Sequence, residues 1–148
     1  MKLSRWAAAL VVLVLAVAPA VAAETGTAAE AKAVLEKVVA AIKADKATAL
    51  AEINAGKFNV KDLYPFCGGP DGNFTAHGAN PSLVGQSMKD RKDPAGKAYG
   101  EEFYKIAQEG KFAEASYMIA KPGESTPMPK ESYITKIGDQ VCGVGFYK

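Results

Sequence analysis

The hydrophobic pattern of this 148-residue chain changes its period near Phe58, and that change limits the folds that it can adopt. From Ala28 to Asp45 the apolar side chains recur every three or four positions, as they do on one face of a helix. A shorter helix is expected from Ala47 to Asn54, where Gly56 follows as a stop signal. After Phe58 the apolar residues fall in short runs. Helices followed by strands predict an α+β domain in which one sheet carries helices on one side.

The residues after Phe58 have the pattern of strands and turns. The runs DLYPFCGG and NFTAHG flank PDGN, whose residues favour a turn, so we expect a β-hairpin there. Pro65 cannot donate to a strand ladder, so the first strand either bulges there or turns that position away from a partner. A loop rich in Pro and Gly leads to a third helix, roughly Gly96 to Gln108. Three antiparallel strands are then expected, in KFAEASYMIA, ESYITKI and QVCGVGFYK.

Residues 1–23 have the pattern of a secretory signal peptide. Lys2 and Arg5 precede an apolar run, and small residues with A-x-A spacing end at Ala22. Cleavage is expected after Ala22 or Ala23, which leaves one domain over residues 24–148, in the periplasm or outside the cell. No second apolar stretch long enough to span a membrane follows in the sequence. The alternative is an uncleaved N-terminal anchor helix.

The charge balance argues against nucleic acid and anionic membranes as partners. The chain has 18 basic and 16 acidic residues, and removal of the leader takes away two basic residues and no acid. The one dense basic spot, Lys89 to Lys92, is interleaved with Asp90 and Asp93. The expected domain is therefore close to neutral, without the basic face that binds polyanions.

Few residues in the sequence are suited to catalysis. His77 is the single histidine, which excludes a site that needs two imidazoles, and the chain has no CxxC, HExxH, GxSxG or P-loop motif. We therefore predict no enzymatic activity, no metal site and no cofactor. The two cysteines, Cys67 and Cys142, either form a disulfide after export or stay as separately buried thiols. A thiol enzyme that pairs one cysteine with His77 is a further reading, and it requires an accessible free thiol.

Four residues are candidates for binding a small carboxylate. His77 ends a short strand beside Gly78, where an imidazole can donate to an anion or can simply be structural. Lys130 adds a cation, and Tyr117 and Tyr133 add two phenol donors. Strict alternation puts Lys130 and Tyr133 on opposite faces of a strand, so both line one pocket only if the strand begins later or bulges between them. Taken singly, a solvated lysine and two core tyrosines are the alternative interpretation.

The long string from DLYPFCGG to EEFYKIA, followed by PKESYITKIGDQVCGVGFYK, resembles the single-Cache type 2 family of bacterial chemoreceptors, sensor kinases and stand-alone exported proteins. The matching pieces are LYPFCGGPDGNFTAHG, NPSLVG, DPAGK, PKESYI and GVGFY, in this order. The resemblance implies a PAS-like, five-stranded antiparallel sheet in the order 2-1-5-4-3, with the long N-terminal helix packed on it and a pocket beneath the loop and third helix. Pro65, the pair Gly68 and Gly69, and Gly78 depart from the usual family pattern.

The same resemblance implies a function. It implies a non-catalytic sensing module for a small organic acid or related metabolite, with pocket-lining positions at His77, Tyr117, Lys130 and Tyr133. In the implied strand order the Cys67 strand lies beside the Cys142 strand, which favours a bridge. Because Lys148 closes the last strand, the signal is expected to pass to a separate membrane-bound receptor or kinase, and the long helix would allow a homodimer. The alternative is an interaction protein that keeps the Cache fold and docks a partner through a sheet edge or the long helix.

Overall fold

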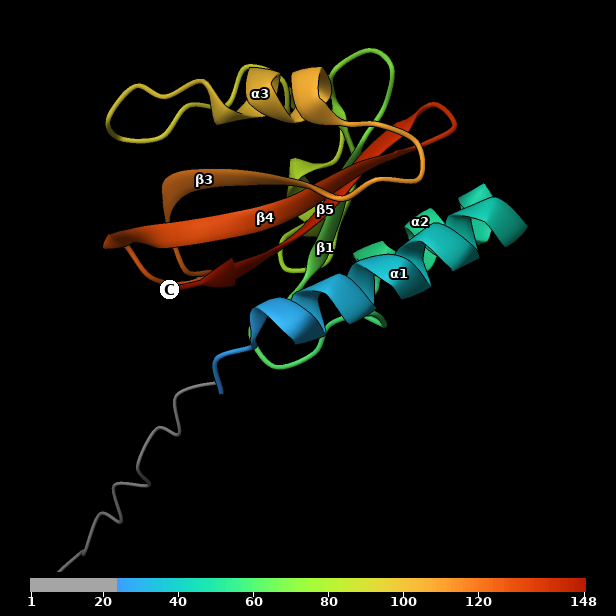
Figure 1. The fold of residues 1–148 in the computed structure, drawn as a ribbon, viewed down its shortest axis with the longest axis horizontal. Coiled ribbons are helices and arrows are strands. Elements are labelled where there is room, and N and C mark those ends of the chain that lie inside the picture. Colours follow the sequence, from blue (N-terminus) through green and yellow to red (C-terminus); the bar gives the residue numbers. More distant parts are fainter. Residues whose placement is uncertain (1–23) are drawn as a thin grey trace, which may run out of the picture.

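The structure is a computed structural model, and it describes residues 24–148 (Figure 1). The predicted signal peptide therefore lies outside the described residues. In chain order the elements are α1 (Ala28–Ala44), α2 (Lys46–Asn54), β1 (Pro65–Gly68), β2 (Phe74–His77), the 3-10 turn η1 (Pro81–Leu83), α3 (Tyr99–Ile106), β3 (Ala113–Ala120), β4 (Pro127–Ile137) and β5 (Gln140–Tyr147). Among the helices of residues 24–148, none combines the length and the apolar character of a membrane span.

Local hydrogen bonds at the helix ends explain where α1 and α2 begin and stop. Thr27 and Glu30 form a capping box, in which the Glu30 amide donates to Thr27 Oγ1 at 3.2 Å and the Thr27 amide donates to Glu30 Oε2 at 2.8 Å. Asp45 ends α1, and its carboxylate then accepts the Thr48 amide at 3.1 Å as the N-cap of α2. Both predicted helices are confirmed to within one residue at each end.

The third helix is shorter than the sequence indicates. The carboxylate of Asp93 accepts the amides of Ala95 and Lys97 at 3.0 and 2.9 Å, which holds this part of the chain in a closed loop. Gly96 has a φ of +85°, a left-handed conformation that a helix cannot contain. The helix therefore begins at Tyr99 rather than Gly96.

The five strands form one antiparallel sheet in the order β2-β1-β5-β4-β3, which confirms the expected order. Cys67 lies directly opposite Cys142 in the β1–β5 pair. Pro65 is the first residue of β1, so its missing amide costs no bond inside the strand. The irregularity in this hairpin falls instead between Cys67 and Gly68.

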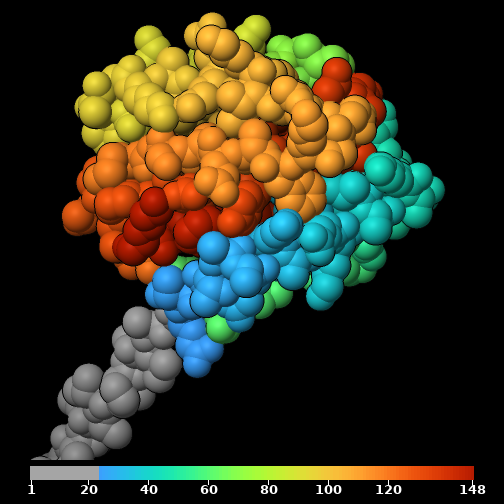
Figure 2. Space-filling model, viewed as in Figure 1, coloured from blue at the N-terminus to red at the C-terminus, as the bar shows by residue number. Residues whose placement is uncertain are grey.

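Helices cover both faces of the sheet, which differs from the expectation of helices on one side. Helices α1 and α2 pack on one face, where Val38, Cys142 and Val144 belong to one buried cluster. Helix α3 and the loop before it pack on the opposite face with Phe66 and Ile134 (Figure 1). Figure 2 shows the loop and α3, in yellow and amber, as a cover on the side away from α1. The central strands are apolar on both faces, so each face requires its own cover.

Candidate functional site

A cavity of about 70 Å³ lies between the sheet and the cover formed by α3 and the preceding loops. Its walls come from β1, β2, β3, β4, η1 and α3, together with the segments at residues 64 and 91. The lining is mostly aromatic and apolar, and no residue of this lining, all of it within 24–148, is acidic. The lining residues are Tyr64, Phe66, Phe74, His77, Leu83, Arg91, Tyr99, Phe103, Tyr117, Ile119 and Lys130.

Lys130 projects from β4 into the cavity wall and is only 2% exposed. Its Nζ donates to the Tyr64 hydroxyl at 2.8 Å and lies 4.1 Å and 4.8 Å from the ring centroids of Tyr64 and Tyr147. Burial lowers the pKa of Lys130 to about 7, because desolvation disfavours the charged amine. The charge of Asp62 acts in the opposite direction, but Asp62 pairs with Lys121, and within residues 24–148 no carboxylate forms an ion pair with Lys130. A lysine amine held among rings in this way leaves a place for an anion.

A glycine on β5 leaves the space that the Lys130 side chain occupies. Gly145 lies beside Lys130 on the cavity face of the sheet, and a Cβ at Gly145 would collide with Lys130 Cε and Ser132 Oγ. Gly145, the second glycine of the motif GVGFY, is therefore needed so that the lysine can lie flat against β5.

His77 ends β2 and reaches the cavity with its ring against three aromatic side chains, those of Tyr64, Phe66 and Phe74. The Asn80 amide donates to His77 Nδ1 at 2.9 Å, which assigns the proton of the neutral ring to Nε2. Burial, then the nearby charges of Lys130 and Arg91, lower the pKa of His77 to about 4. At neutral pH this histidine is an uncharged donor.

Tyr117 also lines the cavity, whereas Tyr133 does not. The Tyr117 ring stacks on Tyr99 with 4.4 Å between centroids, and its hydroxyl shares a 2.8 Å hydrogen bond with Ser132. Burial raises the pKa of Tyr117, so its phenol stays protonated. Tyr133 lies beside Phe146 on the face that α1 and α2 cover, because β4 pairs with both neighbours without a bulge and residues three apart point to opposite faces. The expectation that Tyr133 shares a pocket with Lys130 is therefore wrong.

Tyr64 and Arg91 are among the cavity residues that were not identified from the sequence. Tyr64 lies just before β1 and is the hydrogen-bond partner of Lys130. Arg91 belongs to the basic spot whose charges seemed balanced, yet its guanidinium lines the cavity, 5.5 Å from the centroid of the Phe74 ring. Its Nε donates to the Ser87 carbonyl at 3.1 Å and its Nη2 donates to Gln86 Oε1 at 3.1 Å, and these bonds hold it in place. The sequence shows Arg91 only as one arginine among lysines, and this composition does not predict that its side chain reaches the cavity.

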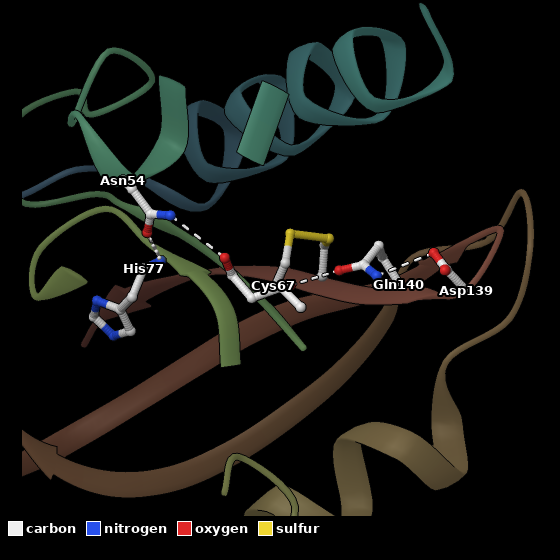
Figure 3. Close-up of a disulfide and its surroundings, with 7 residues drawn as sticks. Asn54, Cys67, His77, Asp139 and Gln140 are labelled. Carbon is white, nitrogen blue, oxygen red and sulfur yellow. Dashed lines mark hydrogen bonds between the residues drawn. A yellow bond between two sulfur atoms is a disulfide. The ribbon is translucent and has the colours of Figure 1, made fainter. Parts of the chain in front are cut away.

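The disulfide lies on the face of the sheet opposite the cavity, and it leaves no thiol in residues 24–148. Cys67 and Cys142 are bonded at 2.06 Å, and both are fully buried (Figure 3). No free cysteine remains in residues 24–148, so the thiol-enzyme reading lacks the free thiol that it requires. The described residues also contain no cluster of three or more His, Cys, Asp and Glu that could hold a metal ion.

A hydrogen-bonded network next to the disulfide connects His77 to α2. Figure 3 shows the side chain of Asn54, which belongs to α2, reaching the main chain of His77. The His77 amide donates to Asn54 Oδ1 at 2.9 Å, and Asn54 Nδ2 donates to the Thr75 carbonyl at 3.4 Å. Thr75 Oγ1 in turn donates to Gln140 Oε1 at 2.5 Å. Strand β2, which carries His77, is thus held to α2 by hydrogen bonds as well as by packing.

Comparisons with known proteins point to one family. The model of the family described as single Cache domain 2 matches residues 2–147. The methyl-accepting chemotaxis protein McpP of Pseudomonas putida is 36% identical over 92 residues, which are 61% of this chain but only 16% of that relative. The chain thus matches a small part of the relative's length.

Solved structures of chemotaxis proteins share the fold. A methyl-accepting chemotaxis protein from Vibrio parahaemolyticus superposes with a TM-score of 0.66 and 30% identity, over 80% of this chain and 86% of the other. A structure titled as the periplasmic sensor domain of a chemotaxis protein gives 0.60 and 24% identity, over 78% of this chain and 86% of the other. A Cache chemosensory domain, whose title concerns carboxylic acid recognition, gives 0.58 and 24% identity, over 78% and 84%. At 24% identity, the last two show the fold alone.

Proposed function

The chain belongs to the single Cache domain 2 family, and from this premise we propose that it is a sensing module that binds a small organic acid in the cavity around Lys130. The observation that carries the proposal is the Lys130 amine, which is 2% exposed and has no acidic residue in the surrounding cavity wall. A carboxylate would supply the missing negative charge, and burying the pair would strengthen the attraction between them.

The other polar groups of the cavity suit the same ligand. Arg91 supplies a second, permanent positive charge, and His77 supplies a neutral Nε2–H donor. The aromatic side chains of Phe66, Phe74 and Phe103 form an apolar wall for the remainder of the ligand. The cavity has roughly half the ~150 Å³ volume of an engineered protein cavity that holds one benzene, so the ligand is small.

We propose that the bound state is read by a separate membrane-bound receptor or kinase, after export of the domain to the periplasm. Support comes from the relatives, whose names and titles describe chemotaxis receptors and a periplasmic sensor domain. Further support comes from the disulfide, which persists in oxidising compartments outside the cytoplasm. Under this proposal residues 1–23 are a cleaved signal peptide, residues 24–148 are the functional domain, and the domain is not an enzyme.

Calorimetric titration of the purified protein with sodium acetate, propionate and succinate tests the binding proposal. We expect acetate or propionate to bind, and we expect Lys130→Met to weaken that binding by about thirtyfold or more, because the carboxylate then loses its buried partner. Methionine fills the same space without a charge, so the variant should still fold. Lys46→Met is the matched control, since Lys46 is an exposed lysine on α2. The proposal fails if the wild-type protein binds none of these acids, or if Lys130→Met binds as the wild type does.

A further inference from the structure

We propose that a second site, separate from the cavity around Lys130, binds an α-amino acid with an apolar side chain. It lies between the loop that follows α2 and the turn that joins β3 to β4, where the surface has a hollow of about 300 Å³. This volume reaches the lower end of the range of small-molecule sites, roughly 300 to 1,000 Å³. Tyr64 is the one residue that lines both the hollow and the cavity around Lys130, so the two sites are distinct.

The charges that line the hollow are balanced, unlike those of the cavity around Lys130. Lys61 and Lys121 contribute two ammonium groups, and Asp62 and Glu124 contribute two carboxylates. A ligand with one charge would meet repulsion from half of these groups. A zwitterion finds an opposite charge for its carboxylate and another for its ammonium group, which is the chemistry of a free amino acid.

Asp62 and Lys121 are built into the hollow, and neither is a fully solvated surface charge. Their side chains are 8% and 21% exposed. Asp62 Oδ1 accepts the Gly26 amide at 2.6 Å, and Asp62 Oδ2 accepts Lys121 Nζ at 3.3 Å. An ammonium and a carboxylate in full contact lie about 2.7 to 2.9 Å apart. The longer distance leaves the Lys121 ammonium able to take a second carboxylate, that of the ligand.

The backbone of Lys61 is a separate indication of a site. Its φ is +56°, and within residues 24–148 no other residue except glycine has a positive φ. A side chain in this left-handed conformation costs free energy, and such residues cluster where a ligand needs the side chain. Glycine would adopt the same turn without that cost. The strain therefore indicates that the lysine side chain is needed here, and its ammonium reaches the hollow.

The uncharged part of the lining selects the side chain of the amino acid. Leu63 is fully buried, and Ala79 and Pro122 complete an aliphatic wall. The hollow has about twice the ~150 Å³ volume of an engineered cavity that holds benzene, so a side chain as large as that of leucine has room. An aliphatic amino acid thus fits both the charges and the wall.

Calorimetric titration of the purified protein with L-alanine, L-valine and L-leucine tests the proposal. We expect leucine to bind most tightly, because it buries the most methylene groups. L-Leucinamide lacks the carboxylate, and N-acetyl-L-leucine lacks the ammonium group. Each should bind about tenfold more weakly than leucine, the effect of losing one hydrogen bond between charged groups. N-acetyl-L-leucine is also too large for the 70 Å³ cavity around Lys130.

Lys61→Gly separates a binding role from a structural one. It should weaken leucine binding by about tenfold, whereas the urea midpoint should stay the same or rise, because glycine relieves the left-handed backbone. Glu124→Gln should weaken leucine binding to a similar extent. Lys57→Gly is the matched control, since Lys57 is an exposed lysine of the same loop and lies outside the lining. It should leave leucine binding unchanged.

The proposal fails if none of the three amino acids binds, or if either leucine analogue binds as tightly as leucine. It also fails if Lys130→Met abolishes leucine binding while Lys61→Gly and Glu124→Gln leave it intact, since leucine would then occupy the cavity around Lys130. None of these results decides whether that cavity holds a small organic acid. That question belongs to the titrations with acetate and propionate, so the two proposals can fail separately.

Discussion

At the scale of single residues, the cavity depends on two glycines of β5, which have no side chain to fill it. Gly143 and Gly145 both lie on the cavity face, and neither has room for a Cβ. At Gly143 the added atom would collide with Ile134 and Phe66, and at Gly145 it would collide with Lys130 and Ser132. The alternating glycines of GVGFY therefore let one aromatic ring and one long amine lie flat across the middle of the sheet.

The protonation of Lys130 predicts a pH dependence for acid binding. With a pKa of about 7 the free amine loses its charge as the pH rises from 6 to 9, whereas Arg91 stays charged and His77, with a pKa of about 4, stays neutral. An anion favours the protonated amine, so binding takes up a proton above pH 7. Affinity for propionate should be nearly constant between pH 5.5 and 6.5 and should then fall, approaching a loss of about tenfold per pH unit.

Titrations of propionate across pH 5.5 to 9 measure this profile, since the ligand is ionised throughout. The phenols that surround Lys130 do not titrate in this window, because burial raises the pKa values of Tyr64, Tyr117 and Tyr147. Lys130→Met should bind weakly and without pH dependence. A flat wild-type profile would show that Lys130 does not hold the carboxylate.

The candidate site could be predicted in part, and the limits are physical. His77, Tyr117 and Lys130 could be placed in one cavity because a resemblance to the family supplied their arrangement across distant strands. The misplacement of Tyr133 was already visible in the alternation of β4. Arg91 was not predictable, since its position depends on bonds to Ser87 and Gln86 in a loop whose path local pattern does not determine.

At the scale of elements, the chain covers the two edges of its own sheet. On β2, the Phe74 amide donates to the Gln86 carbonyl at 2.8 Å and the Phe74 carbonyl accepts the Gly85 amide at 2.9 Å. On β3, the Met118 amide donates to Asp93 at 3.2 Å, and Lys97 Nζ donates to the Ser116 carbonyl. These bonds occupy groups that strand addition would need, so the structure disfavours docking of a partner through a sheet edge.

Asn54 completes this cover on β2 and predicts a stability effect. Asn54→Ala would leave the His77 amide and the Thr75 carbonyl unpaired, which should cost about 1 to 3 kcal/mol of unfolding free energy. Amide exchange at His77 should accelerate as well. Lys46→Ala, on the same helix, should change little, because its ion pair with Asp139 is exposed. Urea unfolding and hydrogen exchange measure both effects, and equal midpoints for Asn54→Ala and Lys46→Ala would contradict the role given to Asn54.

The disulfide predicts a larger stability effect. It joins neighbouring strands across 75 positions of sequence, and such a bridge restricts the unfolded chain. The double variant Cys67→Ala and Cys142→Ala should lose about 3 to 5 kcal/mol of unfolding free energy, measured from urea midpoints. Because both cysteines are fully buried, a reductant should leave the native wild type intact and lower stability only once the chain has unfolded. An unchanged midpoint in the double variant would contradict this account.

Element boundaries were predictable where local chemistry sets them. Capping by Thr27 and Asp45 sets where α1 and α2 begin, and apolar periodicity with the stop at Gly56 was enough to locate both helices from the sequence. The start of α3 was wrong by three residues, because the turn held by Asp93 involves contacts that helical periodicity does not contain. The bulge after Cys67 likewise depends on pairing with two neighbouring strands.

At the scale of the whole molecule, the strand order follows from long-range pairing. β1 lies between β2 and β5, so the first hairpin is attached to the last strand of the chain (Figure 1). Nothing local to β1 or β5 specifies that neighbour, and the order was expected only from the family resemblance. The three-layer arrangement was missed for a related reason, because patterns that show a strand to be apolar do not say which segment covers each face. The candidate site lies between the sheet and α3, where the family resemblance, unlike the local pattern, had placed the pocket.

Export is the remaining step on which the proposed function depends, and its sequence signal makes a direct prediction. Expressed at full length in a Gram-negative bacterium, the chain should be recovered from the periplasm with an intact mass that begins at Ala23 or Glu24 and with the Cys67–Cys142 bridge formed. Leu13→Arg places a charge in the apolar run and should leave the protein unprocessed, with both cysteines reduced in the cytoplasm. Mass spectrometry of cell fractions, with thiol labelling, measures both outcomes. Recovery of the wild type with residues 1–22 still attached would contradict cleavage and would favour an anchored sensor over a released one.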